Sequence, residues 1–353
     1  MTPRERVLAC LDRETPDVVP MRDAPLSWAI QRWEKEGMRP GGWPADFFEN
    51  CIDGTGFDET LQIETEILKD DGRTRVVRNS NGVTEQILPG QNATSHQLEW
   101  TVKNRTDWER LKTRLSPDLN RVSRETRNWL GEIGRKKETW LCITLNGAFG
   151  QGCGLMGMAQ TLEMLVLDPE WMIDIADTYA DFHIGMLELF RKEGIPLDGA
   201  YYNEDIAFKN GPLFSPIVFE RIFLPSMRRL FEYMHRNRGH IFFHSDGLIT
   251  ELIPGLIDAG VDILDPLEVK AGVDLAALKI RFGRKLVWEG NIDARILYYG
   301  TKEEIESEVK RKISLFPEGG YIYRLDGPIT DEASLDNYQW LIECVKRYGT
   351  YRR

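Results

Sequence analysis

The sequence predicts an α/β fold, a (β/α)₈ barrel of the TIM type that carries a β-rich insertion in its N-terminal part. From about residue 139 onward, short apolar runs alternate with amphipathic helical patterns, which is typical of parallel strands joined by helical crossovers. The 353 residues suffice for such a barrel with an insertion. The segment 60–103 contains instead the short β-like runs of a meander. We therefore expect a single domain over residues 1–353, with 60–103 as a β-hairpin insertion or cap.

The composition excludes several classes of protein. Hydrophobic residues make up 42% of the chain, which is too many for a disordered protein. The chain has 45 Lys and Arg residues against 56 Asp and Glu residues, so its formal net charge is −11. This balance argues against nucleic acid or an anionic lipid surface as a partner. The five cysteines include no CxxC pair, as is usual in a reducing compartment, and no apolar run is long enough to cross a membrane. We expect a cytoplasmic protein.

The first elements are predicted from caps and turns. Thr2 is a suitable N-cap for a helix that ends at Leu11. The apolar segment Val18–Met21 is expected to form a short strand, and residues 61–68 a second one. Asn79–Gly82 has the residues of a hairpin turn between two β-like runs.

The second part of the chain contains six strand–helix units. The two early strands would bring the count of strands to eight, the number in a (β/α)₈ barrel. The alternative is an open, doubly wound sheet, but the single GxGxxG pattern, which starts at Gly152, does not directly follow a strand. The expected strands lie near 140–147, 198–205, 240–247, 261–268, 285–293 and 319–327, and the expected helices near 158–193, 216–236, 249–259, 274–282, 302–315 and 334–349.

Polar residues, many of them acidic, come at the ends of these strands. In a barrel, the carboxyl ends of the strands line the active site. The carboxylates chosen from this set as candidate catalytic groups are Glu204, Asp205, Glu289 and Asp326.

His244 and Asp246 form the sharpest local pattern. Residues two apart on a strand point to the same side, so this pair can share one ion or one substrate. Imidazole and carboxylate groups suit zinc or another divalent metal. Glu204 is the preferred third ligand, with Glu289 or Asp326 behind it. The alternative is a hydrogen bond between His244 and Asp246 that only orders the rim of the barrel, which is the edge formed by the carboxyl ends of the strands.

Candidate substrate contacts come from two other strand ends. Asn146 opens a Gly- and Met-rich segment, 146–158, which we expect to be a loop. That loop either faces a ligand or is simply a tight connection. Tyr201 and Tyr202 point to opposite faces of their strand, so at most one faces the pocket, and Tyr202 is taken as the candidate.

Several blocks of sequence resemble the uroporphyrinogen decarboxylase superfamily. They are TPRERVLACLDRETPDVVP at the start, NGPLFSPIVFERIFLPSMRRL, HSDGLITELIPGLIDAGVDILDPLE, KLVWEGNIDARIL and GGYIYRLDGPIT. The resemblance covers the first twenty residues and nearly all of 139–350, and it implies a (β/α)₈ barrel. The superfamily includes a decarboxylase that uses no metal or cofactor, and zinc-dependent methyltransferases that work with a corrinoid protein. Its members often pair at the barrel mouth, so the resemblance also implies a homodimer.

The chain departs from the decarboxylase pattern. That branch carries two arginines on its first strand, in a motif of the form PxWxMRQAGR, and they bind the acidic groups of the tetrapyrrole. This sequence keeps one of them, Arg22, and places Asp23 after it. An acidic rim would also repel a polycarboxylate substrate.

The methyltransferase branch carries the motif His-x-Cys-Gly and a further Cys after the last strand. This chain keeps His244 but has Asp246 and Asp326 where the resemblance places the thiolates. Oxygen and nitrogen ligands leave a metal a harder Lewis acid than thiolates do. The resemblance therefore implies zinc-assisted methyl transfer from an aryl methyl ether to a corrinoid on a partner protein. The cobalt-ligating signature DxHxxG is absent from this chain.

Two other hypotheses stay open. One is a metal-free carboxy-lyase, in which Arg22, Lys270 and Arg324 bind carboxylates and Asp205 or Asp246 transfers the proton. The other is a binding protein that has lost its chemistry, which the dense polar rim disfavours because buried carboxylates without a task are costly.

Overall fold

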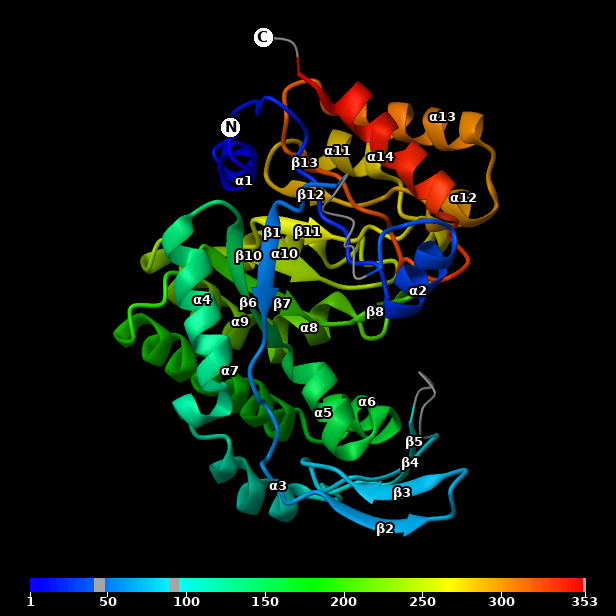
Figure 1. Cartoon of the computed structure of the whole chain (residues 1–353). Helices are drawn as coiled ribbons and strands as arrows, with labels where there is room; N and C mark the ends of the chain where they lie inside the picture. The colour runs from blue at the N-terminus through cyan, green and yellow to red at the C-terminus, as the bar shows by residue number, and fades with distance from the viewer. Residues whose placement is uncertain (41–47, 89–94, 352–353) are drawn as a thin grey trace.

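The computed structural model describes residues 1–40, 48–88 and 95–351, and its centre is a curled parallel sheet (Figure 1). The sheet has seven strands in the order β1-β6-β7-β10-β11-β12-β13, and all neighbours that pair are parallel. These strands are β1 (Ile52–Thr55), β6 (Trp140–Asn146), β7 (Gly199–Asn203), β10 (His240–His244), β11 (Ile263–Asp265), β12 (Val287–Glu289) and β13 (Tyr321–Ile322).

A short extended segment joins the two edges of this sheet. On one side, the Pro20 carbonyl accepts from Tyr323 N at 2.8 Å, and Arg22 N donates to the Tyr323 carbonyl at 3.0 Å. On the other side, Cys51 N donates to the Met21 carbonyl at 2.8 Å, directly before β1. The predicted strand at Val18–Met21 is therefore present as a bridge between the first and last strands of the sheet.

Helices surround the parallel strands (Figure 1). Apolar side chains between the strands and the helices form the main core, as where Tyr202 stacks on Phe243 and contacts Phe231 of α9. The helices are α1 (Pro3–Leu11), α2 (Ser27–Lys35), α3 (Arg105–Leu111), α4 (Arg124–Lys136), α5 (Ala148–Met156), α6 (Met158–Leu167), α7 (Pro169–Lys192), α8 (Pro216–Ile222), α9 (Leu224–Arg236), α10 (Ile253–Ala259), α11 (Leu275–Phe282), α12 (Ala294–Tyr299), α13 (Lys302–Ile313) and α14 (Leu335–Gly349), with 3₁₀ turns at Lys112–Arg114, Leu119–Arg121 and Val269–Ala271.

Helix α1 packs against the curled sheet. Thr2 caps it in a complete capping box with Glu5, as the sequence predicts. Its Val7 and Cys10 join a second buried cluster made of side chains from the strands, including Phe242 of β10.

Four strands within the described residues 66–88 and 95–99 form a separate antiparallel sheet, at the end of the molecule away from both termini (Figure 1). Its strands are β2 (Glu66–Asp70), β3 (Arg75–Arg78), β4 (Thr84–Ile87) and β5 (His96–Glu99), in that order. The turn between β3 and β4 is Asn79–Gly82, and Gly82 takes a φ of 75° there. That this region acts as a cap over the barrel stays a prediction.

Two sequence predictions about elements are wrong. Residues 61–68 do not supply a strand of the parallel sheet; that strand is β1, and 66–70 belong to the antiparallel sheet. The glycine-rich segment 146–158 is not a loop, because most of it forms helix α5.

A short two-stranded ribbon, β8 (Ala207–Phe208) with β9 (Gly211–Pro212), follows β7. Within the described residues, no helix is both long and apolar enough to span a membrane.

Two glycines of α4 give a matched test of helix packing. A Cβ on Gly134 would lie 2.6 Å from the Pro196 carbonyl oxygen, whereas a Cβ on Gly131 would approach only the flexible tip of Arg135, at 3.3 Å. We expect Gly134→Ala to lower the free energy of unfolding by about 1–3 kcal/mol through overpacking. Gly131→Ala should be neutral or stabilising by up to ~1 kcal/mol, because alanine favours the helix. Chemical denaturation measures both, and equal effects would contradict this account.

Asp23 gives a test by pH. It is buried, and its carboxylate accepts from the hydroxyls of Tyr323 (2.9 Å) and Tyr338 (3.2 Å). Burial raises the pKa of Asp23 to about 7, so the folded state binds its proton more tightly than the unfolded state does. This group therefore makes the free energy of unfolding fall as the pH rises from about 4 to about 7. Relative to the wild type, Asp23→Asn should become more stable across that range, as measured by denaturation at several pH values; parallel curves would contradict this.

Candidate active site

One row of polar side chains crosses the carboxyl ends of the parallel strands. In the strand register, Asn146 of β6 lies beside Asn203 of β7, and Asn203 lies beside His244 of β10. His244 in turn lies beside Asp265 of β11. Neighbours in a parallel register point to the same face, so these four side chains share one face of the sheet. This row forms the base of the candidate site.

His244 is held by a buried carboxylate. Its Nδ1 lies 3.2 Å from Asp265 Oδ1, and Asp265 is fully buried. Asp265 also forms an ion pair with Arg324, which follows β13. Burial lowers the pKa of His244, but the charge and hydrogen bond of Asp265 outweigh burial, so the pKa is raised. Burial alone would raise the pKa of Asp265, but Arg324 and His244 together lower it.

The other nitrogen of His244 faces two carboxylates. Nε2 lies 3.7 Å from Asp205 Oδ1 and 3.9 Å from Asp246 Oδ1. One ligand atom from each of the three residues lies within 4.8 Å of the others, which is a spacing that a metal ion can bridge. Asp205 also accepts from Asp246 N at 2.9 Å, so the loops after β7 and β10 are tied together here. His244 and Asp246 thus lie together as the sequence suggested.

A second charged pair lies on the same side of the sheet. Arg22 approaches Glu289 of β12 at 3.3 Å, and its guanidinium lies 4.6 Å from the ring centre of Tyr201 and 4.8 Å from that of Phe242. Glu289 is fully buried, and its Oε2 has no hydrogen-bond partner. Burial raises the pKa of Glu289, although Arg22 opposes this. This carboxyl group is thus a buried acid with a free oxygen.

Glu204 does not join His244 and Asp246, so its predicted role as a metal ligand needs correction. Its carboxylate accepts from Phe149 N (3.0 Å) and Gly150 N (2.8 Å), which are the first free donors of helix α5. A Cβ at Gly147 would lie 1.9 Å from Glu204 Oε2, so only glycine fits there. Burial raises the pKa of Glu204 to about 8. Glu204 therefore caps α5, and this cap explains why the segment is helical rather than a loop.

Asp326 and Lys270 also serve the architecture around the site. Asp326 accepts from Val269 N at 2.7 Å and from Ala294 N at 2.8 Å, so it joins the connections that follow β11 and β12. Lys270 is exposed and pairs with Glu268 at 2.7 Å. Neither side chain is among the groups that surround His244.

Tyr202 points away from the row of polar residues and is buried against α9, so Tyr201 is the tyrosine on the site face. Tyr201 lies 5.6 Å from the His244 ring, centre to centre. Asn146 is in the row, and its side-chain oxygen accepts from Asn203 at 3.2 Å. The sequence prediction that Tyr202 contacts the substrate therefore needs correction, because Tyr201 and not Tyr202 lies on the site face.

The structure places two residues beside His244 that are not among the site residues predicted from sequence. They are Asp265, which holds the imidazole, and Tyr201. Side chains two positions apart on a strand point to the same face. Asp265 is the last residue of β11, and Tyr201 lies two positions before Asn203, the last residue of β7, so the alternation of side chains along the strands indicates both.

Comparisons with known proteins agree with this architecture. Residues 94–348 match the family described as uroporphyrinogen decarboxylase (URO-D). The uroporphyrinogen decarboxylase of Danio rerio is 25% identical over 329 residues, 86% of this chain and 84% of that protein. The one from Vesicomyosocius okutanii is 26% identical over 268 residues, 70% of each chain. The match to the Schizosaccharomyces pombe enzyme is 34% identical over 105 residues but spans only 27% of that enzyme.

A solved methyltransferase from Methanosarcina mazei has a similar structure. The superposition covers 99% of both chains with a TM-score of 0.65. The sequences are only 15% identical, so this likeness concerns the fold.

The contact between Asp265 and His244 can be tested by measuring the pKa of His244. We expect Asp265→Asn to lower the pKa of His244, because the carboxylate that stabilises the imidazolium is gone. It should also destabilise the protein by about 3–5 kcal/mol, because Arg324 loses its buried partner. Titration of the five histidines by NMR follows each ring.

The matched control is Asp262→Asn. Asp262 lies 2.9 Å from His235 Nε2 and raises its pKa in the same way, but at a different place on the molecule. This variant should lower the pKa of His235 and leave that of His244 unchanged. An unchanged His244 titration in Asp265→Asn would contradict the assigned contact.

Proposed function

The chain belongs to the uroporphyrinogen decarboxylase family, and we propose that it is a metal-dependent methyltransferase within it. In this proposal it takes a methyl group from an O-methyl substrate of the aryl methyl ether kind and passes it to a corrinoid on a partner protein. The observation that carries the proposal is the group of His244 Nε2, Asp205 and Asp246 around a common point, with Asp265 behind the imidazole. A metal-ligating histidine usually donates its other ring N–H to such a carboxylate.

The residues present fit a divalent cation such as Zn²⁺. His244 would supply a neutral nitrogen, and Asp205 and Asp246 would supply oxygens. Both aspartates are exposed (side-chain exposures 60% and 54%), whereas His244 is nearly buried, so the group opens toward solvent. When bound, such an ion acts as a Lewis acid on an ether oxygen and helps that oxygen to leave.

Glu289 is proposed as the group that holds a proton for the departing oxygen. Its Oε2 is free, and burial favours its protonated form. Arg22 keeps the carboxyl in place through the other oxygen. Tyr201, whose ring centre lies 5.6 Å from that of His244, is the proposed contact for an aryl group of the substrate.

We also propose that the sheet is a closed (β/α)₈ barrel, with the segment around Met21 as its eighth strand. The hydrogen bonds of this segment to Tyr323 and Cys51 support this. A closed barrel would place all the site residues on one interior face.

The second candidate is a metal-free carboxy-lyase, which the names of the curated relatives favour. Against it, the two arginines of the site are already engaged, Arg22 with Glu289 and Arg324 with Asp265. An acidic substrate would have to compete with these buried carboxylates for each guanidinium.

Metal content tests the proposal. Purified wild-type protein should hold close to one equivalent of a divalent metal, and His244→Ala and Asp246→Asn should lose most of it, because each removes one ligand from a three-residue set. Elemental analysis after mild purification measures this.

The control is His235→Ala, which removes a histidine outside the site and should leave the metal content unchanged. Methyl transfer is followed separately, by the absorbance of free cob(I)alamin mixed with an aryl methyl ether and the enzyme. Absence of stoichiometric metal in the wild type, or CO₂ release that chelators do not affect, would argue for the second candidate.

A further inference from the structure

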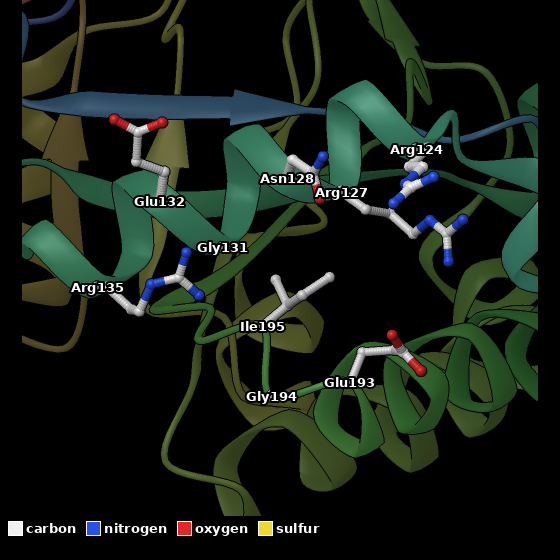
Figure 2. Close-up of a pocket in the computed structure, with 9 residues that line it drawn as sticks. All are labelled: Arg124, Arg127, Asn128, Gly131, Glu132, Arg135, Glu193, Gly194 and Ile195. Carbon is white, nitrogen blue, oxygen red and sulfur yellow. The ribbon is translucent and has the colours of Figure 1, made fainter.

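Three arginines of helix α4 lie outside the parallel sheet, and two of them, Arg124 and Arg135, are exposed. They line a cavity of about 600 Å³ between α4 and the turn that follows α7 (Figure 2). The lining residues are Arg124, Arg127, Asn128, Gly131, Glu132 and Arg135 of α4, and Glu193, Gly194 and Ile195 of the turn.

Helical spacing places the three arginines on one face. Arg124, Arg127 and Arg135 are separated by three and eight positions, which brings them to the same side of a helix with 3.6 residues per turn. Figure 2 shows Arg124 and Arg127 at one end of the cavity and Arg135 at the other, with Ile195 between them. At 1.5 Å per residue, Arg124 and Arg135 start about 16 Å apart along the helix.

These guanidinium groups have no acidic partner. In the described parts of the chain, no ion pair involves Arg124, Arg127 or Arg135, although the protein has an excess of 11 acidic charges. The Arg127 Nε is buried and has no hydrogen-bond partner there.

The two acids of the lining do not neutralise the cluster. Glu132 forms an ion pair with Lys136 at 2.8 Å, and its carboxylate points away from the cavity in Figure 2. Glu193 points toward the Arg127 end and is the only carboxylate of the lining that faces the arginines in that view. The Arg135 side chain lies over Gly131, where the absence of a Cβ leaves room for it.

We propose that this cavity binds a small, elongated polyanion that carries phosphate or carboxylate groups at both ends. A guanidinium group can bind a phosphate or a carboxylate through two parallel hydrogen bonds. Because the arginines lie at opposite ends of the cavity, a ligand that contacts all of them needs more than one anionic group. This site is separate from the proposed metal centre, and it does not depend on the reaction proposed above.

Isothermal titration of the full-length protein with inorganic tripolyphosphate and with citrate tests this site. Saturable binding of one or both probes is expected, and the difference between them identifies phosphate or carboxylate as the preferred group. Arg127→Ala and Arg135→Ala should each weaken binding by about ten- to a hundredfold, because each removes charged hydrogen bonds. Glu193→Gln should tighten binding, a gain that misfolding cannot mimic.

Arg228→Ala is the matched control, since it removes the same charge from the exposed face of α9. It should leave the affinity within about twofold of wild type, as expected for an exposed charge at a distance under salt screening. No saturable binding of either probe, or equal weakening by Arg228→Ala, would overturn the proposal.

Discussion

The candidate active site depends on one buried carboxylate, Asp265. It lies fully inside the protein, and it is stable as an anion there only because His244 and Arg324 both contact it. In return, it fixes the orientation of the imidazole, so that Nε2 is directed toward Asp205 and Asp246. Asp265 ends strand β11, and Arg324 follows β13, 59 positions later. The chemistry of the site therefore depends on the correct order of strands β10, β11, β12 and β13.

Charge compensation explains the character of the interior. Each arginine on the site face has its own carboxylate, Glu289 for Arg22 and Asp265 for Arg324. Burying one charge without its partner costs several kcal/mol, of the order of 3–5 kcal/mol, so these pairs are kept or lost together. These acidic partners engage both arginines beneath an acidic, solvent-exposed rim. That combination suits an uncharged substrate inside and a cation at the rim better than it suits a polycarboxylate.

Much of the architecture follows from sequence patterns, and the exceptions have physical causes. The alternation of strands and helices after residue 139, the capping box at Thr2 and the turn at Asn79–Gly82 are all local, and the structure has each of them. The strand at Ile52–Thr55 was missed because it is short and contains a glycine. The helix at 148–156 was missed because its cap comes from Glu204, more than fifty residues later. His244 and Asp246 lie close together because both belong to one short motif, whereas sequence order does not reveal to which side the carboxylate of Glu204 turns.

The bridge between the edges of the parallel sheet has a consequence for how the chain folds. The hydrogen bond between Tyr323 and Asp23, beside this bridge, joins residues 300 positions apart, so the two edges of the sheet can be connected only after almost the whole chain has left the ribosome. Contacts of such high sequence separation are costly in loop entropy and slow to form. Until then, the backbone N–H and C=O groups at the outer edge of β1 lack the order that this bridge gives them. A chain that pauses early in synthesis has not yet made β13, so the first twenty-odd residues, although they are made first, form some of the last contacts of the fold.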